Sequence, residues 1–302
     1  MTYTYTPNGV ASGGANTIPY ANQQLKQLIL GNTQVNTLFT HIQTATVDVN
    51  YGLTDRIGLE VMVPYRYINS VGQFGAGLTS HFTDQGIGDV LAKVKYNLLP
   101  TLRSMVVLEA GVYFPTGSDN AVGQNGQLAE STLQVGRGAF GFQPSFYQTY
   151  EVISHRLNQF LQGSYRYTLR NNWGYQFGQE YSLNFGFNLV TFPWLTLTEQ
   201  FNFRYKTKDN LQSALYQLEG PPINRPVLID GHVTGRDVPT TNSTYFAYST
   251  GVNVNLWGFC QAYGIVQIPV YRDFNGNLQQ ETSFLFGITK FFVTTPLFSG
   301  NK

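Results

Sequence analysis

Apolar and polar residues alternate one by one over residues 56–67. The odd positions are apolar or tyrosine (Ile57, Leu59, Val61, Val63, Tyr65, Tyr67), and the even positions are polar, charged or small (Arg56, Gly58, Glu60, Met62, Pro64, Arg66). Successive side chains of a strand point to opposite faces of a sheet, so the pattern predicts a β-strand with one apolar face. That face would cover a core in a soluble sheet or meet lipid in a membrane barrel, and one strand leaves both readings open.

The same alternation recurs along most of the chain. It is clearest over residues 175–189, and it also marks residues 44–51, 89–98, 106–115, 140–150, 157–167, 195–206, 245–256, 259–271 and 278–293. Glu199 interrupts the apolar face of its segment, which indicates either a β-bulge or a position that faces protein. The pattern gives about eleven strands, and closed bacterial barrels usually have an even number. We therefore expect about twelve, with the first strand before Val35, at residues 2–6 or 24–30.

The connections between these strands differ in length in a regular way. Short turns lie near Thr54, Pro100, Ser154, Pro193 and Gly258, whereas residues 70–86, 116–137 and 210–242 form long connections rich in Gly, Asn, Asp and Pro. Outer-membrane barrels have short periplasmic turns and long extracellular loops. The sequence thus predicts an all-β fold, a transmembrane antiparallel up-and-down barrel. Residues 1–34 would be an N-terminal segment with a possible first strand, residues 35–293 the barrel, and residues 294–302 a tail.

Composition supports a protein that meets lipid over much of its surface. Only 12% of the 302 residues are charged and 15% are aromatic, whereas ordinary soluble domains carry about 25% charged residues. The formal net charge of +1 gives no electrostatic argument for nucleic acid. No window approaches the roughly 20 apolar residues of a spanning helix. The start, MTYTYTPNGV, has no signal-peptide pattern, so an exported chain would have lost its leader before residue 1, and a chain that never had one remains an alternative.

Three stretches carry a resemblance to a known family. YGLTDRIGLEVMVPY (51–65), GIGDVLAKVKYNL (86–98) and VYFPTGSDN (112–120) resemble the outer-membrane transporters named after the meta-pathway of phenol degradation. The resemblance implies an outer-membrane location and uptake of small, often aromatic, molecules. Residues 283–292 are similar to the aromatic signal that the barrel-assembly machinery reads, although ten more residues follow them.

Candidate catalytic and metal-binding residues are few. The four histidines lie at no metal-ligand spacing, and the single cysteine, Cys260, is near none of them. His41 with Thr40 or Thr44 is the one pairing within the barrel that could act in catalysis, and a structural strand histidine is the favoured reading. We therefore expect no enzyme activity, no metal and no cofactor.

The polar faces of the expected strands carry the charged residues that we predict to line the pore. They are Asp48, Glu60, Arg66, Lys93, Lys95, Glu109, Arg166, Glu180, Arg204 and Lys206, with Asp89 beside them. These charges either select solutes in a pore or seal the lumen by pairing, and a barrel of this size favours a narrow or plugged conduit. We expect partners across the lumen, Lys93 or Lys95 for Glu60, and Glu109 or Glu180 for Arg66.

Two functions are compatible with these sequence features. The favoured one is a passive channel for small molecules, whose partners are membrane lipid, a small-molecule solute and, during biogenesis, the barrel-assembly machinery. The alternative is a structural barrel with a plugged lumen, whose long outer loops, residues 210–242 above all, bind a partner. The sequence leaves the oligomeric state and the solute open.

Overall fold

A computed structural model describes residues 1–9, 35–74, 78–101, 103–122, 129, 131–211, 236–237, 241–256, 260–274 and 278–292. In this part of the chain no helix combines the length and the hydropathy needed to cross a membrane. Its one helical segment is the single 3₁₀ turn η2 (Ser131–Leu133).

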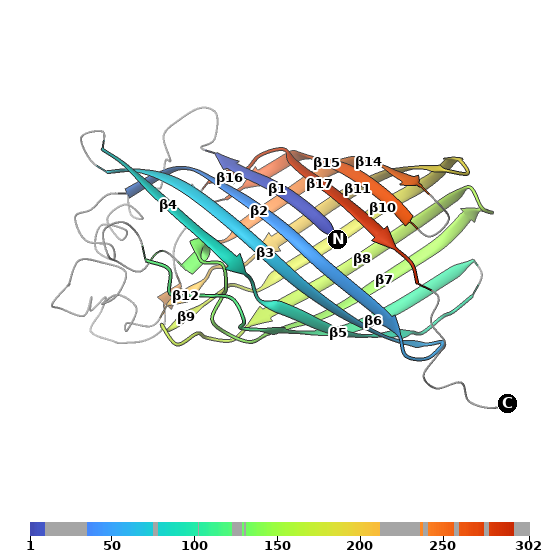
Figure 1. Cartoon of the computed structure of the whole chain (residues 1–302), viewed down its shortest axis with the longest axis horizontal. Coiled ribbons are helices and arrows are strands. Elements are labelled where there is room, and N and C mark those ends of the chain that lie inside the picture. Colours follow the sequence, from blue (N-terminus) through green and yellow to red (C-terminus); the bar gives the residue numbers. More distant parts are fainter. Residues whose placement is uncertain are drawn as a thin grey trace.

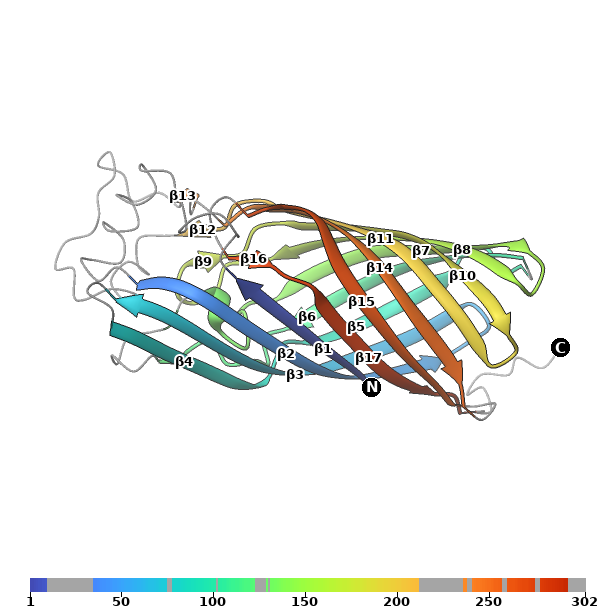
Figure 2. The same cartoon turned by 90° about the horizontal axis from the view of Figure 1, so that it is seen from above.

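Antiparallel strands wrap into a closed barrel, tilted against its long axis (Figures 1 and 2). The segments of the wall are β1 (Thr2–Gly9), β2 (Val35–Gly52), β3 (Ile57–Phe74), β4 (Leu78–Ile87), β5 (Val90–Asn97), β6 (Ser104–Phe114), β7 (Gly141–Ile153), β8 (Leu157–Thr168), β10 (Glu180–Phe192), β11 (Leu195–Lys206), β14 (Ser243–Asn255), β15 (Cys260–Asp273), β16 (Gln279–Gln280) and β17 (Ser283–Lys290). β4 and β5 are two parts of one strand, as are β16 and β17, so the wall has twelve strands. This confirms the predicted fold.

The first and last strands close the barrel. β1 pairs with β17 through Tyr3↔Phe286 and with β2 through Tyr3↔Ala45. Of the two candidates for the first strand, residues 2–6 therefore lie in β1, and residues 24–30 lie outside the described residues.

The exposure of the side chains in residues 57–67 shows which environment each face of this strand meets. Leu59, Val61 and Tyr65 are 38%, 42% and 47% exposed on the outside, whereas Glu60, on the inner face, is 6% exposed. A soluble protein would bury such a continuous apolar face, and a membrane barrel turns it to lipid. The same outward exposure recurs on β10, where Leu183 is 44% exposed. Glu60 and the other charged residues of the predicted polar faces therefore lie on the inner side of the sheet.

The two ends of the barrel differ. At the end we call the turn end, short turns join β2 to β3, β5 to β6, β7 to β8, β10 to β11 and β14 to β15. At the opposite loop end lie β9 (Tyr175–Gln176), β12 (Asn210–Leu211) and β13 (Arg236–Asp237), which form a separate three-stranded sheet (Figure 2). In outer-membrane barrels the turn end is periplasmic and the loop end is extracellular.

Two predicted boundaries are wrong, that of the connection at residues 70–86 and that of the strand at residues 175–189. Residues 70–86, expected as a long loop, belong mostly to β3 and β4, which pair from Phe74↔Leu78 to Tyr65↔Ile87. Polar residues occupy both faces there, so the alternation fails although the backbone ladder continues. The third long connection, residues 210–242, lies mostly outside the described residues.

The expected strand at residues 175–189 is broken at its start. The backbone N–H of Gly178 donates to Asp209 Oδ1 (2.6 Å) and that of Gln179 to Thr207 Oγ1 (2.8 Å). These side-chain acceptors interrupt the strand, so β10 begins only at Glu180. Phe177, expected on the lipid face, is instead 6% exposed.

Glu199 lies on the outer face without a bulge. The pairing there is regular, Phe187↔Glu199 on one side and Glu199↔Thr250 on the other. The hydroxyls of Tyr248 and Thr250 both donate to the carboxylate, the latter at 2.8 Å. Neighbouring hydroxyls thus satisfy a carboxylate on an otherwise apolar face.

Candidate functional site: the charged lumen

A cluster of four charges, which we call the wall cluster, packs on the inner face of β3, β5 and β6. Glu60 Oε2 lies 3.2 Å from the Nζ atoms of both Lys93 and Lys95, and Glu109 lies 3.4 Å from Lys93 and 3.9 Å from Lys95. Ser145 donates a further hydrogen bond to Glu109 (2.7 Å). Three of the four charged side chains are less than 10% exposed, so the cluster is tightly packed.

Lys93 and Lys95 are the partners of Glu60, as predicted, but the prediction that they lie across the lumen from it is wrong. Lys93 lies on β5, directly opposite Glu60 of β3 in the antiparallel register, so the pair runs along the wall and not across the lumen. Neighbouring strands are only about 4.8 Å apart, so long side chains on the same face of the sheet can touch. Side chains on opposite sides of the lumen would have to reach much further. Asp48, on β2, joins the same wall through Asn50, which donates to it (2.9 Å) and accepts from Lys95 (2.7 Å).

The described parts of the connection between β6 and β7, residues 115–122 and 131–140, lie at the loop end and turn toward the inner face of the barrel. Asp89, at the break between β4 and β5, holds them by accepting the backbone N–H groups of Gly117 (3.2 Å) and Arg137 (2.9 Å). Thr116 strengthens the attachment by donating to the carbonyl of Gly88 (2.8 Å). The prediction of a plain outer loop at residues 116–137 is therefore incomplete, because Asp89, 7% exposed, anchors both ends of it.

Three glycines allow this segment to fold so closely. A Cβ on Gly117 would lie 2.6 Å from the Cα of Gly136, so the two backbones touch and leave no room for a side chain. Gly138 has φ +67°, a left-handed conformation that glycine adopts at low cost, and a Cβ there would overlap the carboxylate of Asp119. The family-like stretches 86–98 and 112–120 therefore build this inward fold.

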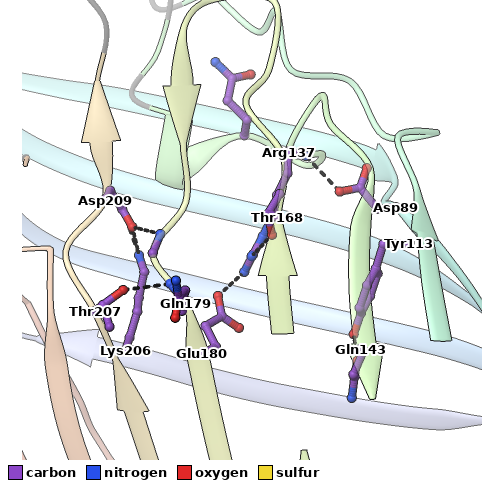
Figure 3. Close-up of polar contacts among 12 residues, drawn as sticks. Asp89, Tyr113, Arg137, Gln143, Thr168, Gln179, Glu180, Lys206, Thr207 and Asp209 are labelled. Carbon is purple, nitrogen blue, oxygen red and sulfur yellow. Dashed lines mark hydrogen bonds and ion pairs between the residues drawn. The ribbon is translucent and has the colours of Figure 1, made fainter. Parts of the chain in front are cut away.

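The segment places Arg137 in the lumen, where it meets Glu180 (Figure 3). Arg137 Nη2 lies 2.5 Å from Glu180 Oε1, Nη1 donates to Thr168 Oγ1 (3.1 Å), and the guanidinium lies 4.6 Å from the centroid of the Phe177 ring. Burial disfavours the charged guanidinium, yet the charge of Glu180 and its hydrogen bond outweigh burial and raise the pKa of Arg137 above its ordinary value. The Arg137–Glu180 pair thus ties the segment to β10, two strands from β7 in the wall.

Arg66 pairs with neither of its expected carboxylates. Its Nη1 donates to the carbonyls of Val135 (2.9 Å) and Gln134 (3.4 Å), both in the inward-folded segment. Glu109 belongs to the wall cluster and Glu180 holds Arg137. The sequence could not show this, because residues 134 and 135 reach Arg66 only through the inward fold.

A second buried carboxylate, that of Asp209, fixes the backbone at the loop ends of β10 and β11. The buried carboxylate of Asp209 lies 2.8 Å from Lys206 Nζ and accepts the hydroxyl of Tyr175 and the backbone N–H of Gly178 (Figure 3). Asp209 was missed, as was Arg137, because both lie in connections where no alternation marks the inward direction.

Arg166 and Arg204, like Arg66, form no ion pair with a carboxylate among the described residues, and each stacks on a tyrosine ring. Arg166 lies with its Cζ 3.6 Å from the centroid of the Tyr113 ring, and its buried Nε has no hydrogen-bond partner. Arg204 lies 4.7 Å from the centroid of the Tyr245 ring and donates to Gln280. Both lie on the face of the sheet opposite the apolar one, as expected, and their role in lining a pore stays a prediction.

His41 lies on the outer face, with its Nδ1 2.7 Å from the hydroxyl of Tyr5. Its ring also packs against Phe39, with 5.0 Å between the centroids. This is the environment of a structural strand histidine, and no group of three or more metal-binding side chains occurs within the described ranges.

Comparison with known proteins agrees with this architecture. The chain is similar to an outer-membrane channel from Pseudomonas putida F1, with a TM-score of 0.61, 12% identity, and 96% of this chain and 94% of the other covered. The NanC porin (TM-score 0.44, 10% identity, 96% and 100% covered) and the transport unit of AIDA-I from Escherichia coli (0.49, 10%, 96% and 89%) are weaker matches on which no argument rests. No curated protein matches the chain.

At this level of identity the channel shows a shared fold and nothing about the solute. The family model described as "Putative MetA-pathway of phenol degradation" matches residues 10–218, well over half of the chain and all three motif stretches. The chain therefore belongs to this family, and it has the closed-barrel fold of bacterial outer-membrane proteins.

Proposed function

We propose that this protein is a passive channel of the bacterial outer membrane, a narrow conduit for small molecules that acts without catalysis. The observation that carries the proposal is the contrast between the two faces of one closed sheet. The outer face is apolar and exposed, and the inner face carries the ionisable residues Glu60, Lys93, Glu180 and Arg204. A polar lumen inside an apolar wall is what passage of a polar solute through a bilayer requires.

The arrangement of the charge pairs supports a conduit more than a seal. The wall cluster pairs along β3, β5 and β6, so these charges do not bridge the lumen. Arg204, on the inner face of β11 almost opposite β3 in the strand order, is exposed to solvent. The inward-folded segment narrows the loop end, and this supports a selective conduit in place of a wide diffusion pore.

We further propose that small aromatic molecules are among the solutes. The support is membership of a family whose description refers to phenol degradation. The test is a liposome-swelling panel with sugars, amino acids and small aromatic compounds of similar size. Faster swelling with the aromatic compounds is expected, and equal rates for all classes would refute this part of the proposal.

The alternative, a plugged barrel that displays its outer loops, is favoured by one observation. Residues 131–137 fill space beside β4, where the N–H of Val135 donates to Asp84 (2.9 Å). Planar bilayers distinguish the two functions. Steady current through the purified protein supports the channel, and silence, even after deletion of residues 212–235, supports the plugged barrel.

A further inference from the structure

The loop-end part of the lumen holds guanidinium groups that form no ion pair with a carboxylate. Five carboxylates there have other partners: Glu180 pairs with Arg137 (2.5 Å), Asp209 with Lys206 (2.8 Å), Glu281 with Arg272 (2.8 Å), and Asp84 and Asp89 accept backbone N–H groups. Among the described residues Arg66 and Arg170 bind carbonyl and amide oxygens, and Arg166 and Arg204 stack on tyrosine rings.

Arg166 shares its nearest acid with another arginine. The register places it directly opposite Glu180, yet the Glu180 carboxylate is bonded to Arg137. Arg166 therefore lies opposite a carboxylate whose hydrogen bond is taken by Arg137. The Tyr113 ring covers one face of the Arg166 guanidinium, and Tyr113 is itself fixed by donating to Gln143 (2.6 Å) (Figure 3). Stacking leaves the N–H donors at the edge of a guanidinium free to bind, and the buried Nε of Arg166 has no hydrogen-bond partner among the described residues.

Arg204 repeats this arrangement further along the wall. It stacks on Tyr245, which is 2% exposed and therefore immobile, and its polar partner Gln280 is neutral. The register sets Arg204 opposite Ser182, whose hydroxyl lies 2.6 Å from that of Ser164. The two arginines are separated by β10, about 10 Å at two strand spacings. By register Arg204 lies one inward-facing position further along the wall from the loop end than Arg166.

We propose that Arg166 on Tyr113 and Arg204 on Tyr245 form a two-step binding site for small organic carboxylates in the lumen. This rests on the proposed channel function and names its substrate class. A guanidinium presents parallel N–H donors that match the two oxygens of a carboxylate, which a halide ion cannot exploit. A guanidinium group that forms no ion pair also attracts anions more strongly than one that a carboxylate already holds.

The first measurement is ion selectivity in planar bilayers. Under a KCl gradient the wild-type protein should prefer anions, and sodium acetate or sodium benzoate should block the chloride current. Arg166→Gln and Arg204→Gln should each weaken this block at least about tenfold, which is the effect of losing one charged hydrogen bond. Arg166→Lys should keep the anion preference and lose most of the block, because lysine carries the charge without the paired donors.

The matched control is Arg156→Gln, which removes the same charge from an exposed turn-end residue and should change neither quantity. Retention of heat-modifiable gel migration shows that each variant has folded. An unchanged reversal potential and an unchanged block in the folded double variant Arg166→Gln/Arg204→Gln would overturn the site and leave the channel function standing.

A second measurement does not depend on conduction. Benzoate binding to the detergent-solubilised protein, followed by isothermal titration calorimetry, should be present in the wild type and in Arg156→Gln and lost in the double variant. Binding of this kind together with silence in bilayers would support the site and refute the channel. Absence of benzoate binding in the wild type would overturn the site even if the protein conducts.

Discussion

Replacing Glu60 by glutamine tests whether the wall cluster is an integral part of the fold. The substitution keeps the size of the side chain and removes the charge that lies 3.2 Å from both Lys93 and Lys95. The two ammonium groups then share Glu109 alone, at 3.4 and 3.9 Å. Because Lys93 is 9% exposed, water cannot replace the lost partner.

The expected loss follows from this burial. Removing one partner of a buried ion pair costs about 3–5 kcal/mol, and because Glu109 remains we expect about 3 kcal/mol for Glu60→Gln. The matched control is Glu281→Gln, which breaks the pair with Arg272, whose two side chains are 27% and 42% exposed. An exposed pair contributes about 0–1 kcal/mol, so this variant should be nearly neutral.

The assay is urea unfolding in phospholipid vesicles, followed by tryptophan fluorescence and by the heat-dependent shift on gels. Glu60→Gln should unfold at a clearly lower urea concentration than both the wild type and Glu281→Gln. If the two variants lose equal stability, or if Glu60→Gln is neutral, water reaches the wall cluster and the burial argument is wrong.

Three further predictions concern the outer face and the inward fold. Leu183→Arg should destabilise the barrel by about 2 kcal/mol, because arginine enters the lipid-facing surface; Asn184→Arg, on the inner face, should cost less, and equal losses in urea unfolding would contradict the assigned faces. Gly136→Ala should displace the inward-folded segment and raise single-channel conductance, because its Cβ would overlap the carbonyl of Gly117; Gly52→Ala, with open space around it, is the control, and unchanged conductance in both would count against a constriction at that segment. Thr250→Val should cost about 1–3 kcal/mol in the same unfolding assay, because it removes a hydroxyl that donates to Glu199 in an apolar environment; a neutral result would mean that water or lipid headgroups solvate that carboxylate.

Alternation along the chain was enough to predict most of the strands and their faces. In a strand the direction of each side chain follows from parity alone, so the outward position of Leu59 and the inward position of Glu60 required no knowledge of the fold. The membrane barrel followed when the regular change between short and long connections and the low content of charged residues were added. Lys93 and Lys95 could also be named as partners of Glu60, because all three lie on polar faces of strands that are near in sequence.

Only the tertiary structure decided which groups meet inside the loop end of the barrel. Asp89 holds Arg137, 48 residues further along the chain, and Arg66 reaches Val135, 69 residues away. These contacts join a strand to a connection, where side-chain direction has no period, so no local pattern could indicate them. The same holds for Phe177, whose strand is interrupted by Asp209, a carboxylate 31 residues beyond Gly178. Sequence periodicity determined the wall of this barrel, and long-range hydrogen bonds to buried carboxylates and backbone carbonyls determined what lies inside it.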